Sequence, residues 1–105
     1  MFGLPESAIK KLSQIFEKYP SVEKVIIYGS RAKGNFKNGS DIDLTMVGDI
    51  SHKELLQISI EIDDLLLPYQ VDLSIFSTLE NDDLKEHIGR VGKDFYVKAK
   101  SCSAS

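Results

Sequence analysis

The 105-residue sequence contains little cysteine and no long apolar segment. Its single cysteine, Cys102, lies among serine and alanine residues, so no disulfide can form within the chain. No apolar run approaches the ~20 residues that a membrane-spanning helix requires. The first residues lack the charged and long apolar regions of a signal peptide. We therefore expect a cytoplasmic protein that does not engage a membrane.

Positive charge is also scarce. The chain has 13 lysines and arginines against 16 aspartates and glutamates, which gives a net charge of −3. This balance argues against a broad nucleic-acid surface, although a local basic loop stays open as a contact. The sequence has no cluster of cysteine and histidine with the spacing of a zinc site. Its length and composition suit one compact domain with one core.

The spacing of apolar residues predicts an α/β domain, of the α+β-like kind, over residues 1–98. We expect a mixed sheet of three to four strands with helices mainly on one face, followed by a disordered tail over 99–105. Strands are predicted over 22–28, 41–47, 71–75 and 94–98, and the first is expected to be central and buried on both faces.

Helices are predicted from capping and stop signals. The first covers 5–19, and residues 30–37 could form a short helix. The next begins at a capping box, Ser51 and Glu54, and ends at Pro68. A second capping pattern at 77–80 predicts a short helix that reaches about Ile88. Three acids, Glu61, Asp63 and Asp64, are interpreted as a solvated helix face.

One segment concentrates the residues from which chemistry is expected. The first strand ends in the turn Gly29-Ser30, a basic loop follows, and Asp41-Ile42-Asp43 comes after ten intervening residues. Residues two apart in a strand share a face and lie ~6.5 to 7 Å apart, so Asp41 and Asp43 point the same way. Asp72, in the next strand, adds a third carboxylate. Such carboxylates, beside the N–H groups of a glycine turn, can hold a divalent metal and a phosphate together.

Three carboxylates that gather without counterions raise one another's pKa, so this arrangement calls for cations. Two Mg²⁺ ions would relieve the repulsion, because Mg²⁺ prefers carboxylate, water and phosphate oxygens. Alone, an Asp-x-Asp pair or a Gly-Ser turn usually belongs to solvated surface. Their conjunction with a basic loop and a further aspartate in an apolar strand favours a metal–phosphate site.

Three other motifs fit less well. The glycines at 29 and 34 have the spacing of a P-loop, but Asn35 stands where that motif requires lysine. The segment from Asp41 begins like a calcium-binding EF-hand loop, but Met46 replaces its glycine and His52 its final glutamate. The segment 88–93 is similar to the GXXG loop of KH domains, a fold that needs far more chain after this loop.

Gly29-Ser30, Asp41-Ile42-Asp43 and a later Asp72 resemble the nucleotidyltransferase superfamily typified by DNA polymerase beta. The resemblance extends from about Val22 to Tyr96. It is closer to minimal single-domain members, which include antitoxins paired with HEPN-domain toxins, than to kanamycin nucleotidyltransferase, which carries a similar core in a longer chain. The chain departs from larger members because it has no second domain to bind an acceptor.

The resemblance implies a Mg²⁺-dependent transfer of a nucleoside monophosphate to an acceptor hydroxyl, with ATP as the expected donor of AMP. Asp41, Asp43 and Asp72 would be the catalytic residues and the ligands of two Mg²⁺ ions. The residues implied to bind the nucleotide are Gly29, Ser30, Arg31, Lys33 and Ser40.

Two kinds of function stay open. In the first, the protein is an active enzyme whose acceptor is a partner protein, an RNA end or a small hydroxylated molecule, with nucleic acid less favoured. In the second, it is an antitoxin-like binding module that neutralises a small helical HEPN-domain partner, with catalysis secondary or lost. The complete set of three carboxylates favours the enzyme, because binding alone does not require it.

Overall fold

The computed structural model describes residues 4–29, 41–67 and 69–98. Their elements, in chain order, are α1 (Glu6–Glu17), β1 (Val22–Tyr28), β2 (Ile42–Gly48), α3 (His52–Asp64), β3 (Val71–Ile75), a 3₁₀ turn (Phe76–Thr78), α4 (Asp82–Val91) and β4 (Lys93–Val97). The short helix predicted over 30–37 and the tail predicted over 99–105 lie outside the described residues. Within those residues, no helix has the length and apolar character needed to cross a membrane.

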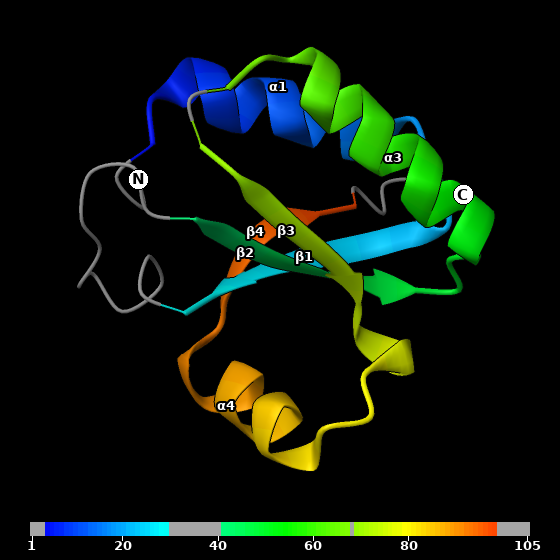
Figure 1. Ribbon diagram of the computed structural model, residues 1–105, viewed down its shortest axis with the longest axis vertical. Helices are drawn as coiled ribbons and strands as arrows, with labels where there is room; N and C mark the ends of the chain where they lie inside the picture. The colour runs from blue at the N-terminus through cyan, green and yellow to red at the C-terminus, as the bar shows by residue number, and fades with distance from the viewer. Residues whose placement is uncertain (1–3, 30–40, 68, 99–105) are drawn as a thin grey trace.

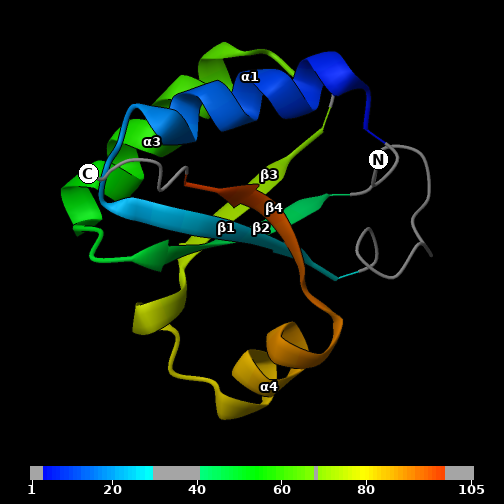
Figure 2. The same ribbon diagram turned by 180° about the vertical axis from the view of Figure 1, so that it is seen from behind.

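A four-stranded mixed sheet forms the centre of the domain, in the strand order β3-β2-β1-β4. β1 pairs antiparallel with β2 and with β4, whereas β2 and β3 run parallel. Parallel neighbours need a crossover connection, which α3 supplies. α1 and α3 cover one face of the sheet, and α4 lies on the other (Figures 1 and 2). The predicted α/β fold, with helices mainly on one face of a mixed sheet, is confirmed.

The hydrophobic core lies between the sheet and the layer formed by α1 and α3. Alternate residues of β2, Ile42, Leu44 and Met46, are fully buried there, and α1 contributes Leu12 and Phe16. Burial of a side chain of this size contributes about 1.5 to 3 kcal/mol. This packing leaves the alternate positions of β2, which include Asp43, on the opposite face.

β1 is central in the sheet, as predicted, but it is not buried on both faces. Val25 and Ile27 are fully buried against the α1–α3 layer. Ile26 and Tyr28 alternate with them and are half-buried, because one short helix covers this side of the sheet. The end of α4 approaches β1 closely at Gly92, where a Cβ atom would stand 2.6 Å from Cγ2 of Ile26. The face that carries Ile26 and Tyr28 is therefore the α4 face.

The predicted capping box of α3 is confirmed. The Glu54 backbone N–H donates to Oγ of Ser51 at 3.1 Å, and the Ser51 backbone N–H donates to Oε1 of Glu54 at 3.2 Å. The helix ends at Asp64, short of the predicted stop at Pro68.

The predicted start of the last helix is wrong. Residues 76–78 form a 3₁₀ turn, so Ser77, the capping residue of the predicted pattern, lies inside this turn and not at the start of a helix. The Thr78 hydroxyl donates to the Ile75 carbonyl at 2.9 Å. α4 begins at Asp82, where the Asn81 side chain accepts a hydrogen bond from the Leu84 backbone N–H at 3.1 Å. The helix then extends beyond Ile88 to Val91.

The interpretation of Glu61 as a solvated acid is also wrong. Its side chain is 28% exposed and forms an ion pair with Lys18 at 2.5 Å. It also accepts a hydrogen bond from the Tyr19 hydroxyl. This bond, with burial and the negative charge of Glu61, raises the pKa of Tyr19 to about 12. Hydrogen bonds from Lys18 and Tyr19 lower the pKa of Glu61. Glu61 therefore ties the chain after α1 to α3.

Candidate active site

Tyr28, Asp43 and Asp72 form one row across three strands on the α4 face. Tyr28, the last residue of β1, is paired with Asp43 of β2. Asp43 is paired in turn with Asp72 of β3. Residues directly opposite one another in neighbouring strands share a face, so the two carboxylates lie side by side on adjacent strands.

Asp41 lies one position before β2 and two residues before Asp43. This spacing directs both side chains to the same side of the strand. Asp41 and Asp72 are exposed, whereas Asp43 is half-buried between them. The structure thus brings the three predicted acids to one end of one face.

The electrostatics of Asp43 reflect this crowding. Burial raises the pKa of its carboxyl group, and the negative charges of Asp72 and then Asp41 raise it further. Neither ion pair found within the described residues involves any of these three acids. The three acids thus place like charges close together, and a cation would relieve their repulsion.

Gly29 makes room for the Asp43 carboxylate. Its φ of +80° lies in the left-handed region, which favours glycine. A Cβ atom at this position would stand 2.5 Å from Oδ2 of Asp43. Gly29, the first residue after β1, is therefore packed directly against the acid at the centre of the row.

A divalent cation fits the chemistry of this donor set. All three candidate ligands offer carboxylate oxygens, which Mg²⁺ prefers. Burial and the charges of Asp72 and Asp41 raise the pKa of Asp43, so the carboxylates repel one another. Within the described ranges, no three acidic, histidine or cysteine side chains are grouped so that they could already hold a metal ion. Like-charge repulsion is expected to keep carboxylates apart until a cation binds.

The other predicted nucleotide-binding residues cannot be placed in this geometry. Ser30, Arg31, Lys33 and Ser40 lie outside the described residues. Their assignment stays a prediction.

Three residues on the α4 face were missed by the sequence-based site. Tyr28 opens the row, and Thr45 and Ser74 are paired with each other in the next row, on β2 and β3. The alternation of strand residues contained the signal for Ser74, because it lies two residues after Asp72 in the predicted strand over 71–75 and therefore shares its face. The contribution of Tyr28 depends on the antiparallel register of β1, which sequence spacing does not specify.

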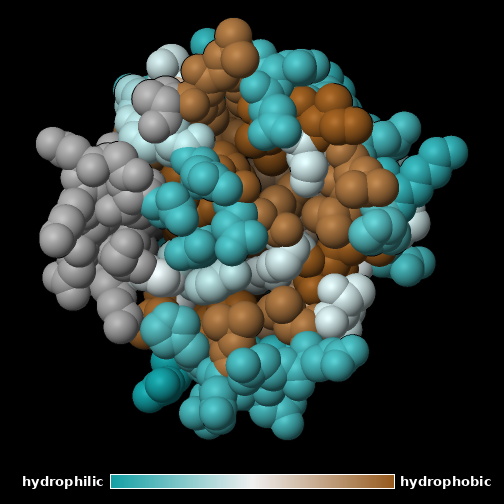
Figure 3. Space-filling view, in the orientation of Figure 1, coloured by the Kyte–Doolittle hydropathy of each residue, from teal (hydrophilic) through white to brown (hydrophobic). Residues whose placement is uncertain are grey.

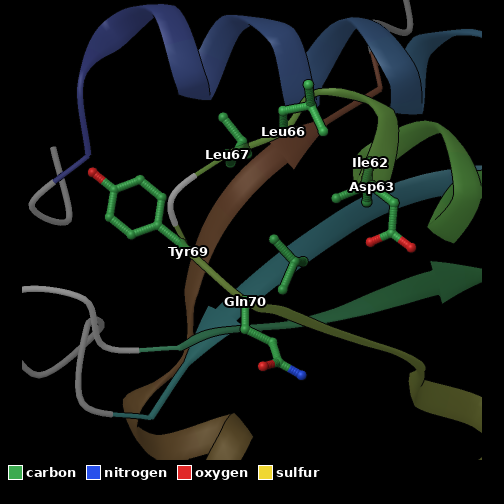
Figure 4. A pocket seen from close by; sticks show the side chains of 7 residues that line it. Ile62, Asp63, Leu66, Leu67, Tyr69 and Gln70 are labelled. Atoms are coloured by element: carbon green, nitrogen blue, oxygen red, sulfur yellow. The ribbon is translucent and has the colours of Figure 1, made fainter.

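A pocket of about 500 Å³ lies on the other face of the sheet (Figure 4). It is formed where α3 ends and β3 begins, and its lining residues are Ile62, Asp63, Leu66, Leu67, Tyr69, Gln70 and Val71. Val71 is paired with the buried Ile42, whereas the adjacent Asp72 points to the opposite side. This pocket is therefore separate from the row of carboxylates.

Comparison with known proteins agrees with this arrangement. Residues 10–101 match the family described as polymerase beta, nucleotidyltransferase. A Methanocaldococcus jannaschii protein named "Putative protein adenylyltransferase MJ0604" is 32% identical over 81 residues, which cover 75% of this chain and 76% of that protein. The chain belongs to the polymerase beta nucleotidyltransferase family, as the sequence motifs predict.

Solved structures share the fold. A chain in the crystal structure of a toxin-antitoxin with AMP-PNP matches with a TM-score of 0.68 at 20% identity, over 92% of this chain and 77% of that one. A chain in the structure of a tri-AMPylated Shewanella oneidensis HEPN toxin in complex with MNT antitoxin matches with a TM-score of 0.62 at 19% identity, over 93% and 74% of the two chains. These similarities confirm the nucleotidyltransferase fold.

Proposed function

We propose that this protein is a Mg²⁺-dependent adenylyltransferase that transfers AMP from ATP to a hydroxyl group on a partner protein. The observation that carries the proposal is the placement of Asp43 beside Asp72 on one face, with Asp41 two residues away and the Gly29 turn against Asp43. The M. jannaschii relative, named as an adenylyltransferase that acts on protein, supports the choice of AMP and of a protein acceptor.

Asp41, Asp43 and Asp72 would hold two Mg²⁺ ions. When bound, these ions would neutralise phosphate charge and lower the pKa of the acceptor hydroxyl. The residues of the chain would then orient the reactants. The acceptor oxygen forms a bond to the α-phosphorus, the bond to the bridging oxygen breaks and pyrophosphate leaves. The acceptor proton passes to Asp72, which lies on the edge strand β3 and is more exposed than Asp43, the residue paired with it.

The nucleotide would be bound by the turn that begins at Gly29. Ser30 is proposed to donate hydrogen bonds to the terminal phosphates from its backbone N–H and its hydroxyl. Arg31 and Lys33 would offset triphosphate charge, and Ser40 would contact the nucleotide at the other end of the loop. Because the reaction consumes ATP, we propose that it takes place in the cytoplasm.

The proposed partner is a small helical protein of the HEPN type. The two solved toxin–antitoxin assemblies support this choice through their shared fold. Apolar side chains also gather over α3 on the face shown in Figure 3. Leu56 and Ile60 lie one turn apart on this helix and are 52% and 60% exposed, and Leu66, just beyond it, is 87% exposed. Interface cores are typically apolar and poor in charge.

These apolar residues lie on the helix layer, across the sheet from the carboxylates. A partner that binds α3 would therefore have to reach around the edge strand β3 to present a hydroxyl to Asp72. The alternative function, a binding module that neutralises its partner without chemistry, would use α3 alone. The presence of three neighbouring acids on the α4 face favours the enzyme.

Transfer of labelled AMP tests the proposal. The purified protein is incubated with Mg²⁺ and ATP labelled at the α-phosphate, with the partner protein, a short RNA or a small polyol as acceptor. We expect label on the partner and matching release of pyrophosphate, both lost in Asp43→Asn. Label on RNA or on the polyol alone would replace the proposed acceptor. A partner complex that forms without pyrophosphate release would favour the binding module and overturn the transferase.

A further inference from the structure

Helix α3 has a second apolar face, on the side that points away from the core. Its core side contains Ile58 and Ile62, which are buried. Leu56 and Ile60 each precede one of these residues by two positions, which places them about 200° around the helix from it. They are 52% and 60% exposed, and α3 lies at the surface of the domain, in front of α1 in Figure 1. The outer face of α3 is therefore open to a second molecule.

Charged residues of opposite sign flank this exposed apolar pair. Lys53 lies three residues before Leu56, and Asp63 lies three residues after Ile60. Spacings of three, four and three residues bring all four side chains to one stripe along the helix, as in the seam of a coiled coil. Lys53 and Asp63 are exposed, and neither takes part in the two ion pairs found within residues 4–29, 41–67 and 69–98. We refer to these four residues as the outer stripe.

The outer stripe is complementary to itself when a second copy runs in the opposite direction. Lys53 and Asp63 each lie five residues from Ile58, and Leu56 and Ile60 each lie two residues from it. In two antiparallel α3 helices that cross at the level of Ile58, Lys53 of each copy meets Asp63 of the other. Leu56 of each copy likewise meets Ile60 of the other. A two-fold symmetric contact forms both kinds of pair twice.

The surroundings of the outer stripe agree with a second copy as its occupant. Gln57 and Ser59, which flank the crossing point, are uncharged, so no like charges meet there. An anionic membrane surface would repel Asp63. The 13 residues of α3 extend over about 20 Å. One such helix pair buries less than the ~1,600 Å² of a standard interface, so we expect a weak dimer with a micromolar dissociation constant.

We propose that two copies of this chain associate through α3, packed antiparallel about a two-fold axis at the level of Ile58. The apolar pairs form the centre of the contact, and the ion pairs between Lys53 and Asp63 determine its direction and register. This association does not depend on the reaction proposed above. It places a second copy on the helix offered there to a partner, so a partner that binds α3 would have to displace it.

Sedimentation velocity of the purified chain over a concentration series, without Mg²⁺, ATP or partner, tests the proposal. The wild type should change from monomer to dimer in the micromolar range. Lys53→Glu and Asp63→Lys should each weaken the dimer about tenfold or more, because each places like charges in both ion pairs. Both variants should fold, since an acid near the start of a helix and a base near its end complement the helix dipole.

Mixing the two single variants tests the antiparallel register. Each copy then offers the charge that the other requires, so the mixture should dimerise as the wild type does, and so should the double variant. Leu56→Ser should weaken the dimer about tenfold or more, because it removes an apolar side chain from both copies. Val97→Ser is the matched control, because Val97 is similarly exposed, at 55%, but lies on β4.

A wild type that stays monomeric throughout the series would overturn the proposal. A dimer that Leu56→Ser leaves intact would overturn it as well, and so would single variants that associate no better when they are mixed. Since no nucleotide or acceptor is present, a failure of AMP transfer would leave this result unchanged. A monomeric wild type would in turn leave the proposed transfer reaction untouched.

Discussion

Gly29 and Asp43 are in direct contact: the space that a side chain at Gly29 would fill is taken by the Asp43 carboxylate, with Oδ2 only 2.5 Å from the position of a Cβ atom. The first residue of the turn predicted to bind phosphate and the acid predicted to bind metal therefore form one packed unit. A change in either one is expected to disturb the other.

Gly29→Ala should disrupt the contact between residue 29 and the Asp43 carboxylate. Alanine at a φ of +80° is strained by roughly 1 to 2 kcal/mol, and its Cβ would push the Asp43 carboxylate out of the row. We expect a less stable protein that folds but has lost most of its Mg²⁺ affinity and transfer activity. Gly89→Ala is the control, because a Cβ atom there meets nothing within 4 Å. Equal Mg²⁺ titrations for the two variants would contradict the packing argument.

Asp43→Asn should abolish transfer and change how stability depends on pH. Because the pKa of Asp43 is raised in the folded state, its contribution to stability is complete below the unfolded pKa of about 3.9 and is lost as the pH rises through the folded pKa. The metal-free variant should therefore match or exceed the wild type in stability at pH 7, and this advantage should vanish toward pH 3.

Denaturant unfolding at several pH values, with a chelator present, measures this difference. Asp49→Asn is the matched control, since Asp49 is exposed and follows β2 at its other end. A wild type that is clearly more stable than Asp43→Asn at pH 7 would show that the carboxylates do not repel one another as described.

Ser30→Ala tests the phosphate-binding turn. A hydrogen bond to a charged group contributes about 1.5 to 3 kcal/mol, so its loss should reduce ATP affinity or the transfer rate roughly ten- to hundredfold. Steady-state kinetics against ATP concentration measure this loss, and Ser7→Ala in α1 serves as the control. Unchanged kinetics in Ser30→Ala would remove this residue from the site.

Glu61→Gln should weaken the contact between α1 and α3. The lowered pKa of Glu61 means that its contribution to stability is present above its unfolded pKa and is lost as the pH falls through the folded value. The raised pKa of Tyr19 contributes stability below about pH 10, which is lost as the pH rises through about 12. Thermal unfolding across this range should show a smaller pH dependence in Glu61→Gln than in Glu86→Gln, an exposed control on α4. Identical pH profiles for the two variants would mean that the contacts of Glu61 with Lys18 and Tyr19 do not contribute to stability.

The sequence predicts the strands and the shared face of Asp43 and Asp72 because strand alternation is a local property. The spacing of Asp41 and Asp43 determines their shared face wherever the strand lies. Contacts that depend on how the helices and strands pack against one another could not be predicted from the sequence. The Tyr28 position follows from the register between β1 and β2, and the role of Glu61 follows from the approach of α3 to Tyr19.

Helix boundaries show the same limit on a smaller scale. Ser51 and Glu54 form a complete capping box and were predicted correctly. The pattern at 77–80 looks similar in sequence, but Ser77 lies in a 3₁₀ turn, and Asn81 caps the helix instead. Several local hydrogen bonds compete at such a site, and sequence spacing alone does not rank them.

Intact mass measurement of the partner protein tests the central claim most directly. The protein is co-expressed with the product of the neighbouring open reading frame, the complex is purified, and the intact mass of each chain is measured. We predict that the partner gains the mass of one or more AMP units with the wild type and gains none with Asp43→Asn, while the complex forms in both cases. A partner of unmodified mass with the wild type, or equal modification with Asp43→Asn, would contradict an adenylyltransferase that works through these carboxylates.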